Sequence, residues 1–189
     1  MKTAATLSFF AAVLVCALAV SANADTKIEK KQVEIRNMAQ DTLKSLYKAD
    51  PRTKAAIKNA AGYAVFSNFG VKILVAGSGS GKGIAVYNKT KHETFMKMLE
   101  LQAGLGMGVK KFRIVFVFDN QKAFESFVNS GWEFGGQTTA AAKNGDKGAA
   151  MAGAVSVSDG VWMYQLTDKG VALEITAKST KYYKDDELN

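Results

Sequence analysis

The chain has 189 residues and a formal net charge of +8, and 48% of its residues are hydrophobic. This is the length of one domain with a core of its own, and the basic balance favours anionic lipid, polysaccharide or nucleic acid over acidic substrates as a partner. One cysteine and one histidine are too few for disulfides or for metal sites built from thiolates or several imidazoles.

The first 24 residues have the organisation of a secretory signal peptide. Lys2 supplies a positive start, residues 7–20 are apolar, and Ala22-Asn23-Ala24 forms a small-residue cleavage site before Asp25. The apolar run is shorter than the roughly 20 residues that a membrane-spanning helix needs. We therefore predict a cut after Ala24 and a periplasmic or secreted protein.

Cys16 offers a second way to process this segment, as the acylated cysteine of a lipoprotein. Such a cysteine usually follows a small residue, whereas Cys16 follows Val15 in the middle of the apolar run. Cleavage after Ala24 is the prediction that fits better. It leaves a mature chain without cysteine and with a net charge of +7, which is +8 less the charge of Lys2.

The segment 25–48 contains neither proline nor glycine and is predicted to be an amphipathic helix. Its apolar residues recur at helical spacings and are Ile28, Ile35, Met38, Ala39, Leu43 and Leu46. Basic residues lie on or near its polar side. Asp50 and Pro51 then predict the N-cap and first residue of a short second helix that ends near Gly62.

After Gly62 the apolar residues alternate with a period of two, which indicates strands. Strands are predicted at 63–68, from the glycine stretch into 84–88, and within 94–109, although residues 94–101 also suit a helical turn. The sequence FRIVFVFD at 112–119 is apolar on both faces and predicts a central strand. Residues 121–129 have helical spacing and predict a short helix packed on the sheet.

Turn signals divide the C-terminal third into hairpins. They are Asn144-Gly145 with Asp146-Lys147-Gly148, then Asp159-Gly160, and then Asp168-Lys169-Gly170. We predict one α+β domain over 25–189, with a helical segment at 25–62 and a glycine-rich β domain at 63–189. The sheet is expected to be strongly curved and mainly antiparallel, or a barrel-like sandwich, with one short helix packed on it.

The sequence GSGSGKG at 77–83 resembles a phosphate-binding loop but lacks its defining residues. Anchored on Gly81-Lys82, the pattern requires glycine where Ala76 stands and a hydroxyl where Gly83 stands. Glycine instead recurs at every second residue, as in a strand with one bare face, and a second run has Gly104, Gly106 and Gly108.

Strand glycines cost roughly 0.5 to 1 kcal/mol each, so something must offset them. Three explanations remain at this point: an element packed unusually close to the bare face, a sharply curved sheet, or a flat ligand lying against the backbone.

The order of motifs resembles the SYLF domain, a lipid-binding module, over about residues 40–180. The motifs are AAGYAVFSN, GSGSGKGIAVYN, QAGLGMGVKKFRIVFVFDNQKAFESF and WEFGGQTTAAAK. The resemblance implies binding to acidic phospholipid, and in some eukaryotic members also to actin, with an N-terminal amphipathic segment and basic residues contributing. It implies no catalytic residues.

The residues that carry chemistry are few and scattered. His92, the only histidine, lies in a turn-like stretch, and Glu93 and Glu100 have no obvious partner in the sequence. The acidic residues 185–187 are predicted to be a solvated tail. We therefore predict no enzyme, no catalytic residue, no cofactor and no metal site.

Two basic clusters are the candidate lipid-binding residues: Lys27, Lys30, Lys31 and Arg36, and then Lys110, Lys111 and Arg113. Each lysine or arginine near an anionic surface contributes about 1 kcal/mol, so either cluster supports weak, salt-sensitive docking. The expected partner is anionic phospholipid or a membrane surface, and no nucleic acid is expected; the sequence does not identify protein partners. The alternatives are a structural or protein-interaction module of the bacterial envelope and, less favoured, a hydrolase built around His92.

Overall fold

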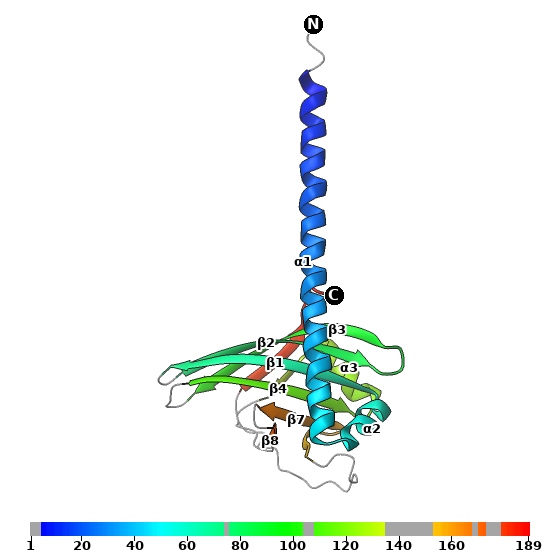
Figure 1. Cartoon of the computed structure of the whole chain (residues 1–189), viewed down its shortest axis with the longest axis vertical. Coiled ribbons are helices and arrows are strands. Elements are labelled where there is room, and N and C mark those ends of the chain that lie inside the picture. Colours follow the sequence, from blue (N-terminus) through cyan, green and yellow to red (C-terminus); the bar gives the residue numbers. More distant parts are fainter. Residues whose placement is uncertain (1–4, 74–75, 104–107, 135–152, 168–169, 173–178) are drawn as a thin grey trace.

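The computed structural model describes residues 5–73, 76–103, 108–134, 153–167, 170–172 and 179–189 (Figure 1). Side chains are described within 25–67, 78–100, 112–133, 153–166 and 180–189. The predicted turn at 144–148 therefore lies outside the described residues.

The described residues contain three helices, α1 (Ala5–Ala49), α2 (Arg52–Asn59) and α3 (Gln121–Ser130). α1 contains the predicted amphipathic helix, which is confirmed. α2 begins one residue after Pro51, and the Asp50 Oδ1 atom accepts a hydrogen bond from the Arg52 backbone N–H at 3.0 Å. Pro51 and not Asp50 therefore holds the N-cap position, one residue later than predicted, although the Asp50 carboxylate still satisfies a free N–H of the first turn.

The strands form one sheet. They are β1 (Gly62–Ile73), β2 (Ala76–Tyr87), β3 (His92–Ala103), β4 (Gly108–Phe118), β5 (Trp132–Phe134), β6 (Val155–Ser158), β7 (Val161–Thr167), β8 (Gly170–Ala172) and β9 (Ser179–Lys184). Their order is β5-β9-β3-β2-β1-β4-β7-β6, with β8 paired to β7, and all pairs are antiparallel. The sheet curls strongly into a half-barrel (Figure 1), so the predicted α+β fold class is confirmed.

Several local predictions are decided by this sheet. Residues 94–101 are strand, because β3 runs through them without interruption. β4 pairs with β1 on one side and β7 on the other, as expected for a central strand. Gly160 turns the chain between β6 and β7 with φ of 69°, a value that glycine adopts easily. The hairpin predicted from Asp168-Lys169-Gly170 is confirmed, because Thr167 of β7 pairs with Gly170 of β8.

α1 packs on one face of the sheet. Its buried residues Ile35 and Leu46 form a core cluster with Val65 of β1, Ile84 of β2 and Val115 of β4. These strand residues alternate with residues that point to the opposite face. The central strands are therefore covered on both sides.

α3 packs on the opposite face, which is dominated by aromatic side chains. Phe66, Phe116, Phe127 and Tyr182 belong to this cluster, and the rings of Phe66 and Tyr182 lie 4.8 Å apart with an edge-to-face tilt. The rings of Phe116 and Tyr182 are 5.1 Å apart and nearly perpendicular. Such pairs add about 0.5–1.5 kcal/mol each to the burial of their apolar area.

The bare positions of β2 lie on this aromatic face. Val65 and Phe66 of β1 lie so close to Gly83 that a Cβ atom there would overlap the Phe66 ring and the Val65 carbonyl oxygen. At Gly62 a Cβ atom would lie 2.5 Å from the Phe124 ring. Close packing thus explains these two glycines, and it occurs together with strong curvature of the sheet.

β2 is also incompatible with a phosphate-binding loop. That motif needs a loop between a strand and a helix, whereas Lys82 lies inside a strand that leads through a turn into β3. Directly after β2, the Asn88 side-chain amide donates hydrogen bonds to the carbonyl oxygens of Ile57 at 2.7 Å and Ala60 at 2.9 Å, which joins this turn to the α2 region.

Replacement of Gly83 by alanine is expected to lower the free energy of unfolding by about 1–3 kcal/mol, because the added methyl overpacks the Phe66 ring. Urea unfolding followed by tryptophan fluorescence measures the change. Ser78→Ala, an exposed position of the same strand, is the control and should change stability by less than about 0.5 kcal/mol. Equal stability of Gly83→Ala and the wild type would contradict the close-packing account.

Candidate functional site

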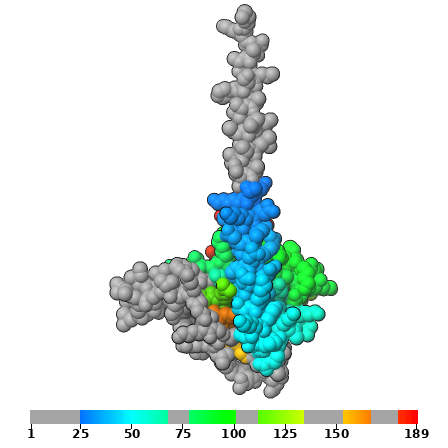
Figure 2. All heavy atoms as spheres, viewed as in Figure 1, coloured from blue at the N-terminus to red at the C-terminus, as the bar shows by residue number. Residues whose placement is uncertain are grey.

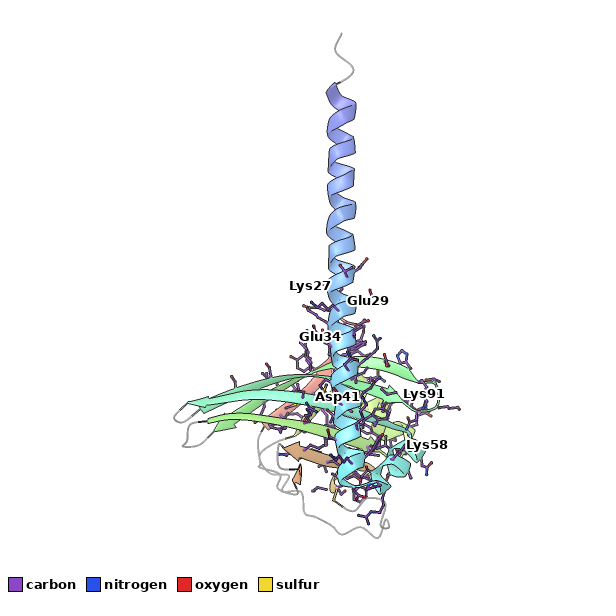
Figure 3. All side chains as sticks on the ribbon, viewed as in Figure 1. Lys27, Glu29, Glu34, Asp41, Lys58 and Lys91 are labelled. Carbon is purple, nitrogen blue, oxygen red and sulfur yellow. The ribbon has the colours of Figure 1, made fainter. Side chains whose placement is uncertain are left out.

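The N-terminal part of α1 extends beyond the sheet, and only its later turns are packed. Figure 3 shows Lys27 and Glu29 on the projecting part and Asp41 where the helix crosses the sheet. Ile35, Ala39 and Leu46 are buried. The helix therefore has a docked half and a half whose side chains from Asp25 to Lys30 are largely exposed.

Arg36 fixes the helix to β3 where the docked half begins. Its Nε donates to the Glu93 Oε2 at 2.7 Å, and its guanidinium carbon lies 5.1 Å from the centre of the Phe95 ring. Glu93 thus has a partner that sequence reasoning did not identify. A planar guanidinium suits this combination of a carboxylate and an aromatic face.

The last five residues, 185–189, form a C-terminal clasp that joins the sheet to α1. The Asp185 carboxylate forms an ion pair with the Lys97 ammonium at 2.8 Å. The Gln32 side-chain amide of α1 donates a hydrogen bond to the Leu188 carbonyl oxygen at 2.8 Å. The Asn189 side chain accepts from the Phe95 N–H at 2.9 Å and donates to the Phe95 carbonyl at 2.9 Å. The clasp continues the pairing of β9 with β3.

The prediction of a solvated acidic tail is therefore wrong for Asp185. Its exposed fraction is 2%, equal to that of Leu188, while Asp186 and Glu187 are exposed. The error arose because the sequence shows a run of acidic residues but not the Lys97 ammonium that the pairing of β9 with β3 brings beside one of them.

Electrostatics inside the domain favour neutral tyrosines and a charged Lys97. Burial, with a smaller contribution from the Glu100 charge, raises the pKa of Tyr182, and burial raises the pKa of Tyr164 to about 12. The hydrogen bond from Lys97 to Asp185 raises the pKa of the Lys97 ammonium. None of these groups is poised to exchange a proton near neutral pH.

A groove of about 460 Å³ runs between α1 and the sheet. Ile35 and Met38 form its helix side, and Leu99 and Tyr183 belong to its sheet side. The exposed fractions of Leu99 and Tyr183 are 40% and 37%, among the highest for large apolar side chains in the described residues. Lys31, Glu34, Ser67, Ser80, Gly81, Lys82, Lys97 and Met98 complete the lining.

A row of polar residues crosses the sheet beside this groove. Ser67 of β1 pairs directly with Lys82 of β2 and with Arg113 of β4, and Lys82 pairs with Lys97 of β3. Directly opposite residues of antiparallel strands have Cβ atoms about 4.5–5.5 Å apart and share a face. We call Arg113, Ser67 and Lys82 the cationic row.

The structure places the predicted basic residues in different settings. Lys27 and Lys30 are exposed on the projecting half of α1, and Arg113 is exposed on β4. Lys31 is half-buried and lies 3.8 Å from Glu187, while Arg36 is held by Glu93. The side chains of Lys110 and Lys111, which belong to β4, lie outside the described residues.

Sequence reasoning did not identify Ser67, Lys82, Leu99 or Tyr183 as site residues. The period of two in the glycine stretch places Lys82 on the side opposite the bare face, which was a usable signal. Its neighbours Ser67 and Arg113 depend on the pairing of strands that are distant in the chain, and a single sequence does not give that pairing.

Among the residues whose placement is described, no group of three histidine, cysteine, aspartate or glutamate side chains is arranged to hold a metal ion. His92 is exposed at the start of β3. The described part of the chain also contains no helix long and apolar enough to cross a membrane.

Comparison with known proteins supports a binding domain. The family model Ysc84, described as "Las17-binding protein actin regulator", matches residues 99–189. Over 160 residues the chain is 29% identical to "Beta cell expansion factor A" of Aeromonas veronii, in an alignment that covers 85% of this chain and 59% of that protein. The chain thus spans about three fifths of the length of this relative.

These matches relate the chain to a family of binding and regulatory modules, which is not a family of enzymes. Residues 99–189 match the model of the SYLF (Ysc84) family, which confirms over this part of the chain the resemblance seen in the sequence. The match indicates a module of the lipid-binding or actin-regulator type.

Replacement of Asp185 by asparagine is expected to lower the free energy of unfolding by about 1.5–3 kcal/mol, because it removes a charged hydrogen bond from a buried site. Asp186→Asn, at the exposed neighbouring residue, is the matched control and should have little effect. The pKa of Lys97 is raised in the folded protein above its ordinary value of 10.5. The contribution of the Lys97–Asp185 pair to the free energy of unfolding is therefore fully present below pH 10.5, and it is lost as the pH rises through the higher pKa of the folded state.

Denaturant unfolding of both variants from neutral to strongly alkaline pH measures this dependence. The deficit of Asp185→Asn should be constant near neutral pH and should shrink above the ordinary lysine pKa. A deficit that Asp186→Asn shares, or that grows with alkaline pH, would contradict the role of the pair.

Proposed function

We propose that this chain is an exported, non-catalytic protein that binds anionic phospholipid surfaces through basic residues. The proposal includes removal of the first 24 residues and a periplasmic or secreted location. Support comes from the match to the SYLF family model, the net charge of +7 that remains after removal of Lys2, and the signal-like segment at the N-terminus.

The observation that carries the proposal is the exposed start of the helix in the processed chain, residues 25–30 of α1. The side chains of Lys27 and Lys30 are exposed. Figures 2 and 3 show that the part of the helix around Lys27 extends away from the sheet. Because the docked half is held by Arg36 and the clasp, this projecting segment can approach a surface without unfolding the domain. Two such lysines contribute about 2 kcal/mol at an anionic membrane, which is weak and sensitive to salt.

A protein-interaction module of the cell envelope is the second candidate. The matched family is described as a Las17-binding protein and actin regulator, which favours protein contacts in at least part of the family. The two candidates differ in one measurable property, since only the first requires anionic lipid.

Charge reversal on the projecting segment, Lys27→Glu with Lys30→Glu, is expected to reduce flotation with vesicles containing anionic phospholipid by about tenfold or more. The matched control is Lys54→Glu with Lys58→Glu on α2, both exposed, which changes the net charge equally and should retain binding. A third pair, Lys110→Glu with Lys111→Glu, tests the second predicted cluster and should also weaken flotation.

Salt of about 0.5 M should abolish the wild-type association, because exposed charges are screened at that ionic strength. Purely zwitterionic vesicles should not carry the protein. Absence of wild-type flotation with anionic vesicles at low salt would refute lipid binding and leave the protein-interaction candidate. Equal weakening by the control pair would show that only net charge matters.

A further inference from the structure

The cationic row contains two positive side chains without an ion-pair partner in the described structure. Arg113 and Lys82 are both exposed, and each lies directly opposite Ser67. By contrast, Lys97 is neutralised by Asp185. The hydroxyl of Ser67 therefore lies between two unpaired cations, an arrangement that suits the oxygens of a phosphate group.

The register of the sheet makes this charge arrangement unfavourable without an anion. Lys82 and Lys97 lie directly opposite each other, and like charges at such positions are destabilising. The Lys97–Asp185 pair relieves part of this repulsion. In the described structure, no ion pair neutralises Lys82 or Arg113. An anion bound at Ser67 would offset the remaining repulsion.

The same row borders an apolar groove. Ser67 and Lys82 line it together with Met38, Leu99 and Tyr183. Its volume of about 460 Å³ is within the range of roughly 300–1,000 Å³ that is usual for sites of small ligands. Positive charge at one part of the lining and exposed apolar side chains at another match a molecule with an anionic head and a hydrocarbon chain.

The acidic side chains near the groove do not cancel this charge. Glu34 lies on the α1 side of the groove and is exposed (Figure 3). Asp185 is paired with Lys97, and Glu187 lies beside Lys31. The single negative charge of Glu34 is therefore outnumbered by the two positive charges of Lys82 and Arg113, and the net charge of these three side chains is positive.

We propose that this groove holds one anionic phospholipid molecule, with its phosphate at Arg113, Ser67 and Lys82 and one acyl chain between Met38, Leu99 and Tyr183. The inference rests on the lipid binding proposed above and goes further, because it assigns a site for a single molecule in place of adsorption to a surface. It also gives Lys82 of the glycine-rich stretch a role in binding phosphate that does not involve a nucleotide.

Native mass spectrometry and fluorescence titration with lysophosphatidic acid, below the concentration at which it forms micelles, test the proposal. The wild type should form a saturable one-to-one complex. Lysophosphatidylcholine should bind at least about tenfold more weakly, because its head carries no net charge. Inorganic phosphate alone should bind weakly, because it gains nothing from the apolar part of the groove.

Matched variants separate the head site from the chain site. Lys82→Gln with Arg113→Gln should weaken the complex about tenfold or more, whereas Lys54→Gln with Lys58→Gln on α2 should not change it. Leu99→Ser should weaken it several-fold, whereas Val33→Ser, at an apolar residue that is 46% exposed on α1 outside the groove lining, should have no effect.

The proposal is overturned if the wild type forms no one-to-one complex, if the control variants weaken it equally, or if inorganic phosphate binds as tightly as the lysolipid. Flotation of the wild type with anionic vesicles distinguishes failure of the groove site from failure of the proposed lipid-binding function. Flotation without a one-to-one complex overturns the groove alone, and failure of flotation overturns the lipid-binding function itself.

Discussion

The structure depends on the packing of α1 against one face of the curled sheet. Ile35, Ala39 and Leu46 bury the apolar stripe of the helix, and the strand residues beneath it would otherwise face water. Full burial of a large aliphatic side chain contributes about 1.5–3 kcal/mol, so a few such residues rival the whole margin of about 5–15 kcal/mol of a domain. Arg36 and the C-terminal clasp fix the helix at the same place. Because the helix covers only part of the face, the groove and the cationic row stay open beside it.

The opposite face explains how the sheet can curve so strongly. Aromatic rings from β1, β4, β9 and α3 fill the inner side, and Gly83 leaves room for the Phe66 ring where any side chain would overlap it. The glycines that resemble a nucleotide motif are therefore part of the packing of this face. Lys82 lies between two of these glycines in the chain and points to the other face, so one stretch of β2 serves the core on one side and presents Lys82 to the groove on the other.

Much of the fold followed from periodicity. The change at Gly62 from helical spacing to a period of two located the junction between helices and sheet, and the doubly apolar stretch at 112–119 identified β4 as central. Contacts between distant segments could not be read in the same way. The partner of Glu93 is Arg36 from the first helix, and Asp185 is buried because β9 pairs with β3. The cationic row has the same origin, since Ser67, Lys82 and Arg113 meet only through the register of three strands.

The central claim is that α1 stays docked while the protein binds lipid, so that the site is formed before the ligand arrives. Spin labels on cysteines introduced at the exposed residues Lys44 of α1 and Lys89 of the turn between β2 and β3 report this directly through pulsed electron resonance. The account predicts one narrow distance distribution that is the same with and without vesicles of anionic phospholipid. A longer or much broader distribution in the presence of those vesicles would show that the helix leaves the sheet, and it would contradict the account.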